Sequence, residues 1–245
     1  MAMAMAATMA EDPAWTGGGD WPVPARVERG LDAALDHGLR LQRGAVIGYL
    51  DRLRARSPDS PQALIRTLER RYLASVATIG AVSGGTAAVP GVGTATALAS
   101  GIAEVAAFIE ATSLFTLAMA EVHGVRFEDP EVRRALVLGI ILGDIGATAI
   151  EAATGSHWAP VLARRADRDL VGSINKRLLR RFLTHFGGRQ GALAVGRALP
   201  FGIGAGVGAA GNVALGRASV RAARRAFGPP PETFGPRIID GRNPT

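Results

Sequence analysis

Cysteine is absent from the 245-residue chain, which excludes disulfide bonds, thiol nucleophiles and cysteine-ligated metal centres. Aromatic residues are scarce at 5%, so the core has to be built from aliphatic side chains and alanine. Lysine is almost missing, because Lys176 is the one lysine among 28 basic residues. With the abundant alanine and glycine, this skew is typical of a GC-rich bacterial genome, so it says little about selection for bidentate arginine contacts.

Motifs for catalysis and metal binding are also missing. The chain contains no GK[ST] phosphate loop and no GxSxG nucleophile motif. The segment 206–211 fits GxGxxG in form, but no strand precedes it, as a dinucleotide site requires. Metal-ligand spacing is not found around the four histidines, His37, His123, His157 and His185. We therefore expect a protein that is not an enzyme and needs neither cofactor nor metal.

Charge and hydropathy point instead to an anionic or apolar partner. The formal net charge is +7 and the mean hydropathy is +0.18. A basic balance of this size favours anionic partners, either lipid headgroups or nucleic acid. The first ten residues, MAMAMAATMA, lack the positive n-region of a secretory signal, so we expect no export.

The hydrophobic pattern predicts an all-α fold. No segment shows sustained period-2 alternation, and apolar residues recur near the helical period. Capping is expected from Ser60 before Pro61 and from Asp129 before Pro130, and helix ends at Gly124 and Gly155. We expect a single helical domain at 26–227 between disordered tails at 1–25 and 228–245. The predicted helices are 26–56, 61–79, 94–122, 130–153, 159–185, 189–198 and 204–227, with a turn from Gly84 to Gly93.

Two glycine-rich apolar segments, 80–101 and 198–216, predict two helical hairpins within this bundle. Each contains small residues spaced by four, a spacing that lets helix backbones approach closely. The alternative is that such spacings arise by chance in a chain rich in alanine and glycine. The rows also raise the hypothesis of self-assembly into a homo-oligomer. The residues expected to mediate helix packing are Gly84, Gly85, Gly93, Gly101, Gly204, Gly208 and Asn212.

Long uncharged stretches raise the question of membrane association. Residues 72–103 and 198–216 carry no charge over 32 and 19 positions. Three acids, Glu104, Glu110 and Asp144, interrupt or adjoin the candidate spans, and an acid at the bilayer centre costs about 2.5–3.5 kcal/mol. We treat them as candidate buried functional acids; alternatively each pairs with an arginine or faces water. The pattern favours membrane-associated hairpins and leaves a soluble bundle open.

Two basic stretches could contact anionic headgroups on the inner leaflet, where each charge contributes about 1 kcal/mol. The alternative is that both stretches form a solvated face. A nucleic-acid site lacks support because no aromatic residues are interleaved for stacking. The candidate headgroup residues are Arg164, Arg165, Arg177, Arg180, Arg181, Arg221, Arg224 and Arg225.

Three phrases of the chain resemble the EcsC protein family. They are Gly84-Gly85 through Pro90-Gly91-Val92-Gly93 to Glu104, then the segment 120–142 with Asp129-Pro130, and finally Leu199-Pro200 through Asn212. The resemblance covers roughly 66–227. It implies a helical, membrane-associated bacterial protein and supplies no catalytic residue.

Two functions from different classes follow. The first is a non-enzymatic protein on the inner leaflet of the cytoplasmic membrane, accessory to transport or envelope processes, that contacts anionic lipid. The second is a soluble helical bundle that binds a lipid or a partner helix in an apolar groove.

Overall fold

The computed structural model describes residues 29, 33, 36, 43–54, 60–87, 94–165, 167–197 and 203–234. The regular structure of these residues is entirely helical, which confirms the all-α prediction. The expected tail at 1–25, most of the expected helix before residue 43, and residues 235–245 lie outside the described residues. The helices are α3 (Arg43–Arg54), α4 (Pro61–Ala87), α5 (Thr94–Val122), α6 (Pro130–Ile141), α7 (Asp144–Thr154), α8 (Trp158–Arg165), α9 (Arg168–Arg197) and α10 (Ile203–Phe227).

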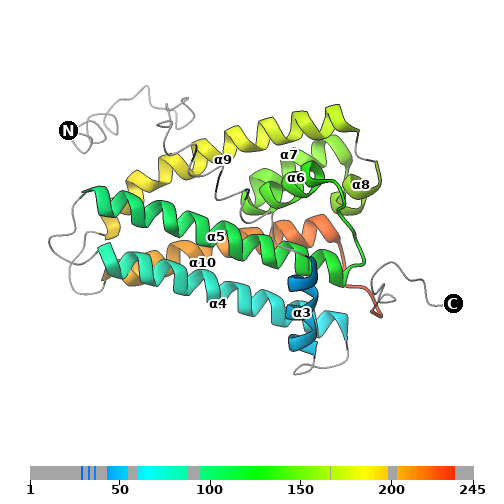
Figure 1. Ribbon diagram of the computed structural model, residues 1–245, viewed down its shortest axis with the longest axis horizontal. Helices are drawn as coiled ribbons and strands as arrows, with labels where there is room; N and C mark the ends of the chain where they lie inside the picture. Colours follow the sequence, from blue (N-terminus) through cyan, green and yellow to red (C-terminus); the bar gives the residue numbers. More distant parts are fainter. Residues whose placement is uncertain are drawn as a thin grey trace.

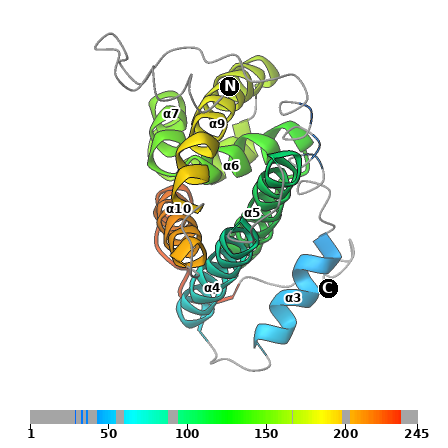
Figure 2. The same ribbon diagram turned by 90° about the vertical axis from the view of Figure 1, so that its left-hand side faces the viewer.

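Three long helices, α4, α5 and α10, run side by side along the long axis of the molecule (Figure 1). The end-on view shows α4 between α5 and α10, with α6, α7 and α9 stacked on the other side of α5 and α10 (Figure 2). Helix α3 lies outside this assembly, across one end of α5. Among the described helices, none covers much of the outer face of α4.

Helix starts follow the local signals in the sequence. The Ser60 hydroxyl accepts a hydrogen bond from the backbone N–H of Ala63 at 3.2 Å, directly before Pro61 opens α4. The Asp129 carboxylate accepts one from the backbone N–H of Glu131 at 2.8 Å, before Pro130 opens α6. Both caps act as predicted.

Two predicted helix bounds are wrong, because tertiary contacts decide whether a glycine continues a helix or breaks it. Helix α4 does not stop near residue 79 but continues through Gly84 and Gly85 to Ala87. The helix expected over 130–153 is split, because Gly143 adopts φ 61° and separates α6 from α7. A Cβ at Gly143 would also lie 2.7 Å from Cβ of Ala218 on α10, so glycine serves both the backbone and the packing here.

The boundary between α8 and α9 also differs from the prediction. The expected helix over 159–185 is divided near Asp167, whose carboxylate accepts a hydrogen bond from the N–H of Asp169 at 3.1 Å and caps α9. The expected break after residue 185 is absent, since α9 continues through Gly187 and Gly188 to Arg197. Tandem glycines alone therefore do not end this helix.

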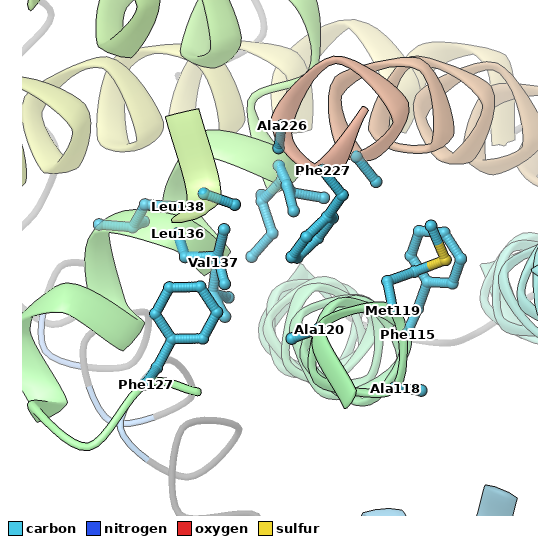
Figure 3. Close-up of a cluster of buried hydrophobic side chains, with 14 of the residues drawn as sticks. Phe115, Ala118, Met119, Ala120, Phe127, Leu136, Val137, Leu138, Ala226 and Phe227 are labelled. Carbon is cyan, nitrogen blue, oxygen red and sulfur yellow. The ribbon is translucent and has the colours of Figure 1, made fainter. Parts of the chain in front are cut away.

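The core is aliphatic, as the shortage of aromatics predicts. Helix α6 lies at its centre and is buried from Ala135 to Ile141, so apolar residues cover its whole circumference. Figure 3 shows Leu136, Val137 and Leu138 of α6 in one buried cluster with Phe115 and Met119 of α5 and Phe227 of α10. The largest ring, Trp158 of α8, is fully buried.

Candidate functional site

Glycine residues bring the backbones of α4 and α10 into direct contact. A Cβ atom placed on Gly80 would overlap the carbonyl oxygen of Gly208, and one placed on Gly208 would overlap the carbonyl oxygen of Gly80. Gly84 lies one turn further along α4, and its Cα is 3.4 Å from the Cβ position of Gly208. No other residue type fits this crossing without separating the two helices.

The close approach extends along α10 at four-residue intervals. A Cβ on Gly216 would lie 2.8 Å from Cγ2 of Val76, and Asn212 is buried between Gly208 and Gly216. Gly85 is half-buried, whereas Gly93 and the surroundings of Gly101 and Gly204 lie outside the described residues. Gly80 was missed as a packing residue, although its spacing of four from Gly84 continues the small-residue row.

A buried carboxylate joins the three long helices. Glu104 on α5 is 7% exposed. Its Oε2 accepts a hydrogen bond from the Ser83 hydroxyl of α4 at 2.7 Å, and its Oε1 accepts one from Nδ2 of Asn212 on α10 at 3.1 Å. The structure thus places Glu104 and Asn212 together, and adds Ser83, which no pattern in the sequence singled out.

A second polar contact lies deeper along the same unit. The Tyr72 hydroxyl of α4 is 2.9 Å from Oγ1 of Thr112 on α5, and its ring stacks on Phe115 with centroids 4.5 Å apart. Burial raises the pKa of the Tyr72 hydroxyl to about 12, while hydrogen bonds from Ser219 and Thr112 lower it by less.

This shift predicts a loss of stability in alkali. The unfolded chain releases the Tyr72 proton near pH 10, whereas the folded protein holds it to about pH 12, so the free energy of unfolding falls as pH rises between these values. Between pH 9 and pH 11 we expect the free energy of unfolding to fall by about 1 kcal/mol more in the wild type than in Tyr72→Phe. Urea unfolding at the two pH values measures this difference. Tyr49, whose pKa burial also raises, is present in both proteins. Parallel pH profiles would contradict the prediction.

Charged side chains on α4 and α10 stop at one level. Arg71 is the last charged residue of α4, and Arg217 is the first of α10. A Cβ on Gly216 would lie 3.1 Å from Leu73, so the antiparallel packing sets these two arginines at the same height. Beyond that height neither helix carries a charge.

Helix α5 follows the same division. Thr112 of α5 contacts Tyr72 of α4, the residue after Arg71. Glu110 lies about half a turn from Thr112 on α5, so Glu110 is near the height of Arg71. We call this level the boundary, and we call the segments Tyr72–Ala87, Thr94–Ile109 and Ile203–Gly216 the uncharged end. The three segments of the uncharged end contain one acidic residue, Glu104, and its side chain is buried between the helices. The outward side chains described there are Ala74, Ser75, Thr78, Val82, Ala103, Ala210 and Ala214, beside Gly206.

The other two candidate acids do not share the surroundings of Glu104. Glu110 is exposed, so the expectation that it is buried is wrong. The Asp144 side chain is 48% exposed and forms ion pairs with Arg221 at 2.8 Å and Arg225 at 3.7 Å, so it too is not a buried acid. In both cases the side chain leaves the apolar face of its helix and reaches water or an arginine.

Three arginines of α10, Arg221, Arg224 and Arg225, are held by acids of neighbouring helices. Arg224 forms a bidentate pair with Glu69 of α4 at 2.6 and 2.7 Å. Arg225 binds Glu151 of α7 through Nε and Nη2, and Arg221 binds Asp144 through two nitrogens. These side chains join α10 to α4 and α7.

The arginines of α8 and α9 differ. Arg164, Arg177 and Arg180 are exposed, as is Lys176, and within the described residues no ion pair engages them. Arg181 is half-buried and its Nη1 lies 3.5 Å from the carbonyl oxygen of Ile145. The surroundings of Arg165 lie outside the described residues. The seven candidate headgroup residues whose side chains are described therefore fall into an engaged set and a set without an ion pair among the described residues.

Among the described residues, one helix is long and apolar enough to be compared with a membrane span. The stretch Ala103–Val122 of α5 meets the length and hydropathy of a membrane span, and 61% of it is buried in the protein. The core helix of a soluble protein passes the same test. Across the described part of the chain, no three histidine, aspartate or glutamate side chains gather as a metal site.

Comparison with known proteins supplies no relative. No protein-family model, no curated protein and no solved structure matches this chain. The resemblance to the EcsC family therefore stays a prediction, and the function has to be argued from the residues themselves.

Proposed function

We propose that this is a non-enzymatic, membrane-associated protein whose uncharged end enters one leaflet of a bilayer. The observation that supports the proposal is the arrangement of polar groups at this end, which is the opposite of that in a water-soluble bundle. Small uncharged residues face outward, while the carboxylate of Glu104 and its partners Ser83 and Asn212 face inward. Water-soluble bundles place charge on the outside, whereas in lipid the polar groups must be satisfied within the protein.

The size of the uncharged end fits partial insertion. Segments of 14 to 16 residues reach about 21–24 Å at roughly 1.5 Å per residue, less than the hydrocarbon thickness of about 30 Å. This shortfall in length favours entry from one side over a complete crossing.

The soluble alternative has less support from the described residues. A depression beside α3 is lined partly by Val46, Leu117 and Phe127, but its volume of about 180 Å³ is below the roughly 300–1,000 Å³ of small-molecule sites. Glu121, Arg126, Glu128 and Arg133 also line it. Such a charged, small depression does not favour an acyl chain.

Insertion predicts that a new charge at the uncharged end weakens vesicle binding. Ala210→Glu places a carboxylate on the outward face of α10, about 10 Å beyond the boundary, and we expect at least tenfold weaker binding. The matched control is Ala45→Glu, on an exposed position in the first turn of α3, where an acid suits the helix dipole. Co-flotation with phospholipid vesicles measures both.

The outcomes separate the candidate functions. Equal binding by wild type and both variants would show that this end stays out of the bilayer. A wild type that binds no vesicles would favour the soluble bundle, and native mass spectrometry would then test for bound acyl chains. Unaltered circular dichroism of Ala210→Glu is the required check on folding.

A further inference from the structure

Three exposed basic side chains of α9 form a surface with no acidic partner among the described residues. Lys176, Arg177 and Arg180 all lie on the outer side of α9, opposite the buried Leu178 and Phe182. This distinguishes them from Arg221, Arg224 and Arg225 of α10, whose guanidinium groups already bind carboxylates. We call the three residues the α9 basic face. Charge left uncompensated within the fold is available to an anion from outside.

The α9 basic face lies close to the boundary of the uncharged end. Arg181 reaches the carbonyl oxygen of Ile145 at 3.5 Å, next to Asp144, which binds Arg221 of α10. Arg221 is one helical turn from Arg217, which marks the boundary. Since Lys176, Arg177 and Arg180 precede Arg181 by one to five residues, the whole face lies within about two and a half turns, or about 14 Å, of the boundary.

An exposed apolar side chain lies beside this face. Ile145, in the first turn of α7, is 47% exposed and touches α9 through its backbone contact with Arg181. A bare aliphatic side chain next to free cations is the composition found on proteins at lipid interfaces, where the apolar group enters between headgroups. Nucleic acid is a weaker fit, because the described exposed residues of α9 include no aromatic ring for base stacking.

We infer that the α9 basic face binds the anionic headgroups of phospholipids at the membrane surface that the uncharged end enters. This inference rests on the proposed function and adds the lipid class and the residues that recognise it. The distance to the boundary is comparable to the Debye length of about 8–10 Å, so these charges lie within the field of an anionic surface. Each basic side chain raises the affinity for an anionic membrane roughly fivefold at this distance, so three together raise it about a hundredfold.

The test compares two triple variants of equal charge change. Lys176→Gln/Arg177→Gln/Arg180→Gln removes the α9 basic face, and Arg52→Gln/Arg126→Gln/Arg168→Gln removes three exposed arginines elsewhere. Co-flotation is measured with vesicles of phosphatidylcholine alone and with one quarter phosphatidylglycerol, at low and high salt. We expect the wild type and the control variant to prefer the anionic vesicles. The α9 variant should bind the anionic vesicles about a hundredfold more weakly than the wild type, and its binding should no longer depend on salt.

Failure of this inference and failure of the proposed function give different results. An α9 variant that still prefers anionic vesicles as strongly as the wild type would overturn the headgroup assignment, while binding to neutral vesicles would leave insertion standing. Absence of wild-type binding to both vesicle types would overturn both. Displacement of the wild type from anionic vesicles by a single-stranded oligonucleotide, with direct oligonucleotide binding lost in the α9 variant, would assign the face to nucleic acid instead.

Discussion

Gly208→Ala is expected to destabilise the protein by about 2–3 kcal/mol, although alanine is the better helix former. The added methyl group would overlap the carbonyl oxygen of Gly80 on α4. Backbone cannot rotate away as a side chain can, so the two helices must separate along their closest contact. We expect the loss to appear in both thermal and urea unfolding monitored by circular dichroism.

Gly206→Ala is the matched control, two residues away on the same helix. Gly206 is exposed, and a Cβ there meets nothing within 4 Å. The same substitution should therefore stabilise α10 by about 0.5–1 kcal/mol through helix propensity and reduced chain entropy. Opposite signs for the two variants would establish the glycine contact; a stabilising effect of both would show that α4 and α10 do not pack this closely.

Gly80→Ala extends this comparison to the other helix. Its Cβ would overlap the carbonyl oxygen of Gly208, so it should be as damaging as Gly208→Ala. The double variant should cost less than the sum of the two single variants, because helices that have already separated leave room for the second methyl group.

Much of the fold could be predicted from local signals in the sequence. The bounds of α5 agree with the prediction over 94–122, and the caps at Ser60 and Asp129 lie where their hydrogen-bonding side chains indicate. These features depend on a few neighbouring residues, so the chain itself contains the necessary information. The end of α7 at Gly155, with φ 82°, belongs to the same group.

The errors of the sequence-based prediction occur where contacts between residues distant in the sequence determine the backbone conformation. Gly84 and Gly143 are both glycines in apolar surroundings, yet one continues a helix and the other breaks it. Gly84 packs near Gly208, so the contact with α10 offsets its poor helix propensity of about 1 kcal/mol. Gly143 takes up a left-handed conformation against Ala218. Neither partner could be identified before the helices were placed in space.

The candidate site shows the same limit. Glu104 and Glu110 lie on one apolar helix, and the sequence offered no reason to separate them. Six residues turn the helix by about 600°, which leaves their side chains about 120° apart around the axis. One therefore points between α4 and α10, and the other points outward. The arginines divide in the same way, because acids on α4 and α7 engage α10 but none of those described engages Arg177 or Arg180.

Glu104→Ala is expected to lower the free energy of unfolding by about 3 kcal/mol or more. The substitution removes the hydrogen bonds that Glu104 accepts from Ser83 and Asn212, and each of these buried donors loses that acceptor, at about 1–3 kcal/mol each. Glu110→Ala, the same change at an exposed position of the same helix, should alter stability by no more than about 0.5 kcal/mol. Urea unfolding of the two variants gives the comparison directly.

A double-mutant cycle then assigns the loss to the junction between helices. Asn212→Ala removes the amide donor, so the Glu104→Ala/Asn212→Ala variant should be less destabilised than the sum of its parts, with a coupling of about 1–3 kcal/mol. Additive effects would show that the carboxylate does not hold α10. If the coupling is present, a carboxylate buried in the uncharged end contributes to the alignment of α4, α5 and α10, as polar groups do between helices in lipid, where leaving them unpaired is costly. The inward acid and the outward alanines would then be two parts of one arrangement, suited to a protein end surrounded by hydrocarbon.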